Sequence, residues 1–166
     1  MSEIPFEPKP RNLTVLHAPV NTGTVELRVI KDRLEDMRGL IGGGYIEIVH
    51  NFAPIDDSRS VAMVCDEEGL LKELPPNFHL YDASPPRYIA GDAFFCEYVR
   101  GDEDLHSISA KAARLLARMF GRRFTMRCRV CGCTDDRACD GGCSWARPCL
   151  CSKCAGKGDG KQLDQA

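Results

Sequence analysis

Eight of the ten cysteines of this chain lie between Cys128 and Cys154. Cysteine thiolates bind zinc and iron strongly, so a segment this rich in cysteine is a candidate metal site. Two C-x-x-C pairs bracket it, with 19 residues between them. One such pair brings two thiolates to one ion, and a second pair completes a tetrahedral site. The candidate ligands are Cys128, Cys131, Cys133, Cys139, Cys143, Cys149, Cys151 and Cys154.

The four cysteines inside the bracket could form a second site with four sulfurs, or a two-metal cluster with bridging sulfurs. Spacing alone does not assign the pairs, so the sequence predicts one or two zinc ions. The segment contains one Trp and few apolar residues, which is too little for a hydrophobic core. Bound zinc would have to supply its folding free energy, roughly 10 to 16 kcal/mol per structural ion. We expect the segment to be unfolded without metal.

Two other interpretations of the cysteines compete with zinc. The chain opens with MSEIPFEPKP, without a basic or apolar signal region, so we expect no export to an oxidising compartment and disfavour disulfides. Zinc is favoured by the two C-x-x-C pairs and by Gly132, Gly141 and Gly142, which allow tight turns. An iron–sulfur cluster also remains open, because four cysteines at short irregular spacing can hold one.

The rest of the chain has the composition of an ordinary globular domain. It has 166 residues, 43% of them hydrophobic, enough for one domain and a small appendage. No apolar run approaches the roughly 18 to 20 residues of a membrane span, so we expect a cytoplasmic protein without membrane contact. The predicted division is a flexible arm (1–12), an α+β domain (13–101), a basic helix and linker (102–127), the metal module (128–154) and a disordered tail (155–166).

Periodicity predicts an α+β fold: a small antiparallel or mixed sheet with flanking helices, followed by a Cys-rich metal knuckle. Runs rich in β-branched and aromatic residues predict strands at 13–18, 24–30, 45–50, 60–65, 88–90 and 93–99. Leucine and methionine at helical spacing predict a helix over 31–40, ended by the glycines at 42–44. We expect Leu70, Leu71 and Leu74 to pack, and Cys65 and Cys96 to be buried apolar residues.

Charge is divided unevenly along the chain. Residues 1–110 contain 10 Lys and Arg against 19 Asp and Glu, a net of −9, whereas residues 111–166 contain 12 against 5, a net of +7. An apolar stripe predicts a helix over 102–120 that packs on the sheet, with acidic residues at its start. The candidate nucleic-acid-binding residues on and after it are Lys111, Arg114, Arg118, Arg122, Arg123, Arg127 and Arg129.

Such a basic run could bind a phosphate backbone, or it could be a solvated helix face that balances the acidic body of the protein. Trp145 could stack on a base, but a single Trp in a metal knuckle is more often its hydrophobic anchor. Both pairs of alternatives stay open. The sequence predicts no oligomeric state.

Three motifs resemble, in order, an uncharacterised domain family carried by phages and plasmids, many from actinobacteria. They are GGGYIEIV at 42–49, DEEGLLKELPPN at 66–77 and AGDAFF at 90–95. The resemblance spans about residues 13–106 and implies a shared fold and origin, in the cytoplasm of a host bacterium. Because the family has no known function, it implies no catalytic residues.

The cysteine segment resembles C-terminal tails of similar mobile-element proteins. The match runs through C-x-x-C-G-C-T, A-C, G-G-C-x-W and a final L-C-x-x-C. Cys149 departs from it, since similar sequences tend to have an acidic residue there. The resemblance therefore implies a spare thiol at Cys149, which leaves seven thiolates for metal.

These observations favour a non-enzymatic accessory or regulatory protein of a phage or plasmid. In this hypothesis zinc folds the tail, and the basic surface contacts nucleic acid or a host protein. One alternative is an iron–sulfur redox or iron sensor. Another is an inhibitor of a host defence or replication protein that acts by protein–protein contact.

Overall fold

The computed structural model describes residues 11–80 and 87–157. The predicted arm and tail therefore lie largely outside the described residues. Within these ranges, no helix is both long and apolar enough to cross a bilayer.

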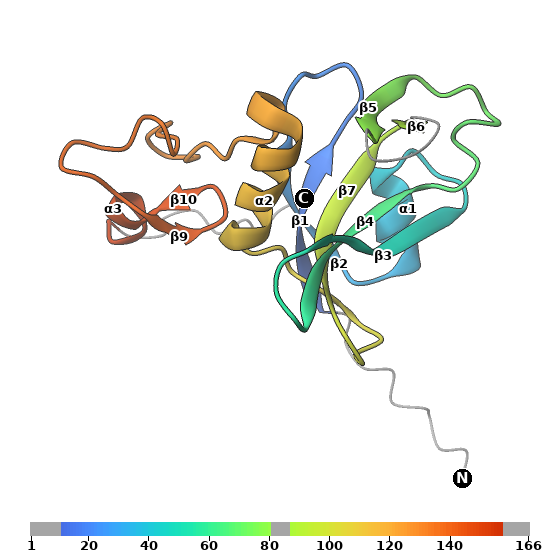
Figure 1. The fold of residues 1–166 in the computed structure, drawn as a ribbon, viewed down its shortest axis with the longest axis horizontal. Coiled ribbons are helices and arrows are strands. Elements are labelled where there is room, and N and C mark those ends of the chain that lie inside the picture. The colour runs from blue at the N-terminus through green and yellow to red at the C-terminus, as the bar shows by residue number, and fades with distance from the viewer. Residues whose placement is uncertain (1–10, 81–86, 158–166) are drawn as a thin grey trace, which may run out of the picture.

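The main body is a six-stranded sheet in which every neighbouring pair is antiparallel (Figure 1). The strand order is β2-β1-β7-β4-β3, and β8 pairs with β7. The strands are β1 (Asn12–Ala18), β2 (Glu26–Lys31), β3 (Ile46–Pro54), β4 (Arg59–Asp66), β7 (Ala93–Val99) and β8 (Leu105–His106). A separate ribbon pairs β5 (Pro76–Leu80) with β6 (Arg87–Ala90). The predicted α+β class is confirmed.

Helices cover both faces of this sheet. On one face lie α2 (Ala110–Phe120) and the 3-10 turn η1 (Gly121–Phe124), and on the other lies α1 (Leu34–Leu40). Because both faces are covered, β4 and β7 are buried almost throughout. This burial explains why their sequences are continuous apolar runs instead of alternating ones.

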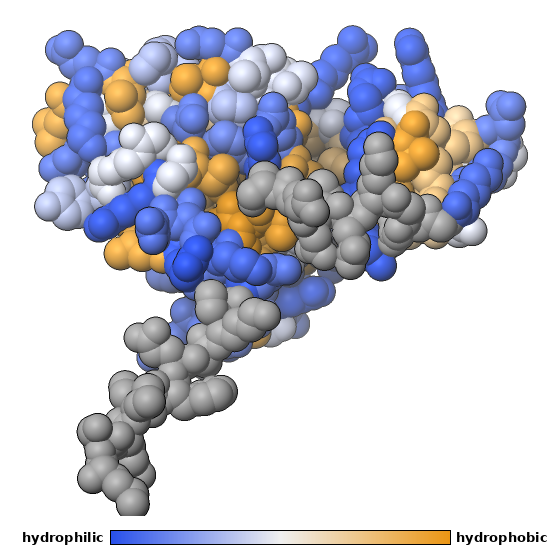
Figure 2. Space-filling view, turned by 180° about the vertical axis from the view of Figure 1, so that it is seen from behind, coloured by the Kyte–Doolittle hydropathy of each residue, from blue (hydrophilic) through white to orange (hydrophobic). Residues whose placement is uncertain are grey.

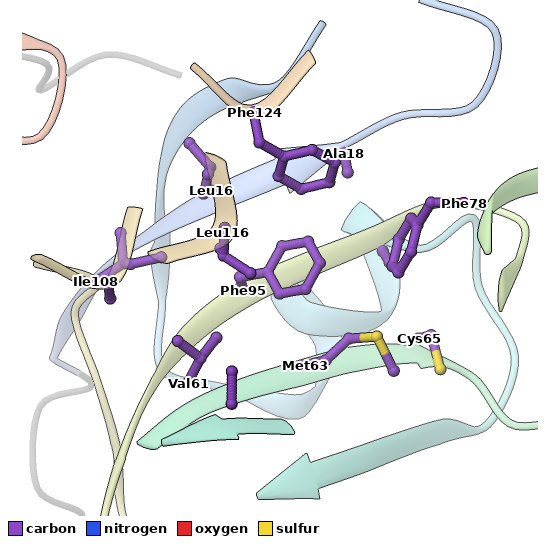
Figure 3. Packing of buried hydrophobic residues seen from close by; sticks show 13 residues of the cluster. Leu16, Ala18, Val61, Met63, Cys65, Phe78, Phe95, Ile108, Leu116 and Phe124 are labelled. Carbon is purple, nitrogen blue, oxygen red and sulfur yellow. The ribbon is translucent and has the colours of Figure 1, made fainter. Parts of the chain in front are cut away.

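Aromatic rings fill the α2 side of the core (Figure 3). The ring centroids of Phe95 and Phe124 lie 5.5 Å apart in an edge-on contact, and those of Phe78 and Phe95 lie 5.7 Å apart. Phe124 is fully buried. It therefore anchors the segment between α2 and the cysteine module to the core of the sheet domain.

Helix α2 begins later than predicted. The chain forms no helix over 102–109, because Leu105 and His106 pair with β7. The side chain of Asp102 instead accepts a hydrogen bond from the backbone N–H of Asp104 (3.0 Å) in a turn. The Ser109 side chain caps the helix by accepting from Ala112 N (3.2 Å), so the acidic residues do not lie in its first turn.

Three residues that were expected to pack, Leu70, Leu71 and Met119 of the apolar stripe over 102–120, are not in the core. Leu71 is 84% exposed and Leu70 55% exposed, in the turn after β4, while Met119 of α2 is 45% exposed. Burial was predicted from spacing alone, but no element packs over these side chains in the part of the chain that the structure describes.

Other local predictions are confirmed. β1 and β2 form an antiparallel hairpin. Gly42, Gly43 and Gly44 follow α1 with φ between 83° and 91°, a region in which glycine ends helices at little cost. Cys65 and Cys96 are buried, and burial raises the pKa of each thiol to about 12.

Candidate metal centre

The cysteine module follows η1 and lies on the far side of α2 from the sheet (Figure 1). Its regular elements are β9 (Trp145–Arg147), β10 (Leu150–Cys151) and the short helix α3 (Ser152–Ala155). Its own buried residues are Cys128, Cys133, Leu150 and Cys151. Three of these four are cysteines, so sulfur occupies the place of a hydrophobic core.

The first C-x-x-C pair lies on a tight turn. Gly132 N donates to Cys128 O (2.8 Å), and Cys128 N donates to Cys133 O (2.8 Å). Gly132 has φ 76°, which a residue with a Cβ adopts only at a cost. Burial opposes ionisation of Cys128, but backbone N–H groups of Cys131, Cys151 and Val130 directed at its sulfur outweigh this and lower its pKa.

The second pair lies where a hairpin meets a helix. β9 and β10 pair antiparallel, and Cys151 ends β10 while Cys154 lies in α3. Ser152 N donates to Ser144 O (2.7 Å) and Ser144 N donates to the Ser152 hydroxyl (3.1 Å), which ties the helix start to the hairpin. Cys151 N also donates to Cys128 Sγ (3.5 Å), so the two pairs face each other.

The structure brings the cysteine sulfurs into two overlapping groups. Cys128, Cys131, Cys151 and Cys154 form the first group, and Cys131, Cys133, Cys139 and Cys151 form the second. Within each group the sulfurs lie within 4.8 Å of one another. Cys131 and Cys151 belong to both groups, and this sharing was not assignable from spacing.

A third turn brings another thiol to the second group. Cys143 Sγ lies 3.8 Å from Cys133 Sγ and accepts a hydrogen bond from Cys139 N (3.4 Å). Gly142 N donates to Cys139 O (2.8 Å) and has φ 80°, closing the turn between the two cysteines. The two groups together contain six thiols, and Cys143 lies beside them as a seventh.

The sulfur spacing fits tetrahedral metal coordination. Cys131 Sγ lies 3.6 Å from Cys139 Sγ and 3.8 Å from Cys151 Sγ. A zinc–sulfur bond of about 2.3 Å gives a tetrahedral edge of about 3.8 Å. A disulfide would instead need about 2.05 Å between sulfurs, and all eight thiols are free. The module is therefore able to hold a metal ion.

Cys149 differs from the other seven. Among the described residues its sulfur belongs to neither group. Its side chain is half-buried, and burial raises the pKa of its thiol. Its backbone has φ 57°, the left-handed region in which Asn and Asp are enriched among non-glycine residues.

Burial and hydrogen bonds at the sulfurs shift the pKa values of three further cysteines. The thiol of Cys131 is the main cause that raises the pKa of Cys139 to about 12, and burial raises that of Cys154 to about 12. Burial opposes ionisation of Cys151, but hydrogen bonds led by Cys154 N–H lower its pKa to about 6. Crowded sulfurs cannot all ionise without a counter-charge, and a divalent cation supplies one.

Asp135 links the module to α2, a role that its sequence position did not reveal. Its Oδ1 accepts from the indole N–H of Trp145 (2.8 Å) and lies 3.4 Å from the Arg114 guanidinium. Trp145 is half-buried and packs against the sulfur core. The indole therefore anchors the module, with its polar edge satisfied.

One residue of the predicted basic run differs from the other six in its placement. Arg123 turns inward, donating to Pro19 O (2.7 Å) and Asn77 O (2.9 Å), and burial lowers its pKa. Arg114 pairs with Asp135, and Arg127 donates to Gly132 O (3.1 Å). The exposed members are Lys111, Arg114, Arg118, Arg122, Arg127 and Arg129. Figure 2 shows hydrophilic side chains projecting around the module, at the right.

Comparison with known proteins finds a domain family in the N-terminal part of the chain and none in the cysteine module. Neither a curated protein nor a solved structure matches it. The model of a domain of unknown function, DUF3846, matches residues 13–121, which end before Cys128. That range contains the sheet, α1 and α2. Because the match covers more than half of the chain, this protein belongs to the DUF3846 family.

Proposed function

We propose that this chain is a non-enzymatic zinc protein whose C-terminal module folds around metal and whose basic surface binds nucleic acid. The observation that carries the proposal is the pair of overlapping sulfur groups, which share Cys131 and Cys151. In keeping with the mobile elements that the resemblance implies, its role would be accessory or regulatory.

Sulfur spacing favours single metal ions over an iron–sulfur cluster. In a cluster of four irons each iron binds one cysteine, so the cysteine sulfurs are spread around a core of iron and inorganic sulfide. Here four sulfurs lie within 4.8 Å of one another in each group, which leaves no room for such a core. A tetrahedral ion fits this space, and zinc is the metal that most often occupies tetrahedral thiolate sites.

We infer two ions for each chain. Two tetrahedral ions need eight coordination positions, and seven thiolates fill them if one sulfur bridges. The first ion takes Cys128, Cys131, Cys151 and Cys154. The second takes Cys133, Cys139 and Cys143 with a bridging sulfur from Cys131 or Cys151. This assignment uses every converging sulfur and leaves out only Cys149.

The nucleic-acid part of the proposal is supported by the charge division. The exposed basic residues of α2 and the linker lie beside the module, in residues 111–166, whose formal net charge is +7. Each phosphate contact by such residues releases counterions, so binding weakens as salt rises. A host protein remains the alternative partner for the same surface.

Fluorescence anisotropy with labelled DNA and RNA tests this proposal. We expect the zinc-loaded full chain to bind, with log Kd rising linearly with log salt, and a strong chelator to abolish binding. The absence of binding to every DNA and RNA probe would contradict the nucleic-acid proposal and favour a protein partner. Binding that survives complete zinc removal would contradict the role of the metal module.

A further inference from the structure

A pocket of about 560 Å³ lies between the linker that follows α2 and the first turns of the cysteine module. Its size is in the range of sites that hold small organic ligands. It is lined by Arg122, Thr125, Arg127, Thr134, Asp136 and Arg137. Arg137, Thr125 and Thr134 were not among the predicted binding residues.

The linker side of the pocket is held by the core of the sheet domain. Phe124 and Met126 are buried and alternate with Thr125 and Arg127, which face the pocket. Arg123 is bonded inward to two carbonyl groups, whereas its neighbour Arg122 is exposed. One arginine of this pair thus has a structural role, and the other lines the pocket.

The module side is a tight turn. Thr134 and Arg137 exchange two backbone hydrogen bonds of 3.1 Å. Between them, Asp135 is bonded to Trp145 outside the pocket, so that Asp136 is the carboxylate lining it. Arg137 therefore lines the same pocket as Arg122 and Arg127, and Asp136 is the one carboxylate among the six lining residues.

Three guanidinium groups and one carboxylate give the pocket a net positive charge. Within residues 11–80 and 87–157, none of these three arginines forms an ion pair. Like charges held around one concavity repel each other, and a bound anion would relieve this repulsion. Guanidinium groups match phosphate oxygens in geometry, and the two Thr hydroxyls can donate to the same oxygens.

We infer that this pocket binds the phosphate of one nucleotide unit, either within a nucleic-acid strand or in a free nucleotide. The inference rests on the proposed function and names the site at which it acts. Thr134 directly follows Cys133, and Arg137 lies two residues before Cys139. Both pocket residues therefore depend on the second sulfur group for their position, so the phosphate site requires metal.

Competition binding with matched arginine variants tests the site. The zinc-loaded full chain is titrated with a labelled 5′-phosphorylated oligonucleotide, and pyrophosphate and AMP are tested both as competitors and, by calorimetry, as direct ligands. We expect Arg122→Gln and Arg137→Gln to weaken binding about tenfold or more, the loss expected for one charged hydrogen bond. Arg100→Gln removes the same charge from an exposed side chain after β7 and should have little effect. Asp136→Asn should tighten binding.

Zinc content and circular dichroism of each variant separate a lost contact from a lost fold. If the oligonucleotide binds but the pocket variants behave like Arg100→Gln, the pocket is overturned and the proposed function stands. If only pyrophosphate or AMP binds, and Arg137→Gln abolishes it, the site is supported with free nucleotides as its ligands, and the nucleic-acid proposal fails. If no probe binds, both fail.

Discussion

The cysteines of the module differ in backbone conformation and in whether their sulfurs belong to a sulfur group. Cys131 and Cys151 each lie in both sulfur groups, at the centre of the site. Cys149 lies two residues before Cys151, yet its left-handed backbone leaves its sulfur out of both groups. At the residue scale, conformation and not spacing distinguishes a ligand from a spare thiol.

Replacing Cys149 should leave the metal site intact. We expect Cys149→Asn to keep two zinc ions and to unfold at an equal or slightly higher temperature, because Asn tolerates φ 57° better than Cys does. Cys151→Ser, the matched variant at a shared ligand, should lose at least one ion and destabilise the module. Native mass spectrometry and thermal unfolding measure both. Loss of an ion in Cys149→Asn would make it a ligand.

At the scale of elements, α2 connects the two parts of the molecule. Its inner face packs Ala112 and Leu116 into the core of the sheet domain. Its outer face presents Arg114 to Asp135, which in turn binds the indole of Trp145. The helix therefore contacts the module through polar interactions that run from Arg114 to Asp135 to Trp145.

Removing Asp135 should loosen the module from α2 without unfolding the sheet domain. Asp135→Ala deletes the acceptor of the indole N–H at an exposed site, where water can replace it, so we expect a loss of about 0.5–1.5 kcal/mol. Trp145 is the single Trp of the chain, so its emission reports the change directly. We expect a red-shifted, more easily quenched emission in Asp135→Ala and little change in Asp136→Ala. Identical spectra in the two variants would argue against this link.

Helices and strands were predicted correctly where the local sequence pattern determines them. The apolar runs of β4 and β7 predict strands because covered strands need no alternation. The start of α2 was mispredicted, because the acidic residues at 102–104 resemble a helix start and only pairing with β7 excludes it. Which sulfurs share an ion also escaped prediction, since the β9–β10 hairpin and the Cys139–Cys143 turn together set their distances.

At the scale of the whole molecule, two units rely on different forces. The sheet domain has a hydrophobic core on each face of the sheet, whereas the module buries three cysteines and one leucine. Metal therefore matters to the stability of the module and much less to that of the sheet domain. Chelation should unfold the module alone, with a shift in Trp145 emission and little loss of strand signal in circular dichroism.

The number and type of metal ions per chain tests the two-ion site most directly. Native mass spectrometry and an absorption spectrum would be recorded on protein purified without oxygen. Two zinc ions per chain and no visible absorbance are the predicted result. One zinc ion, iron with acid-labile sulfide, or an ordered module without any metal would contradict the seven-thiolate site.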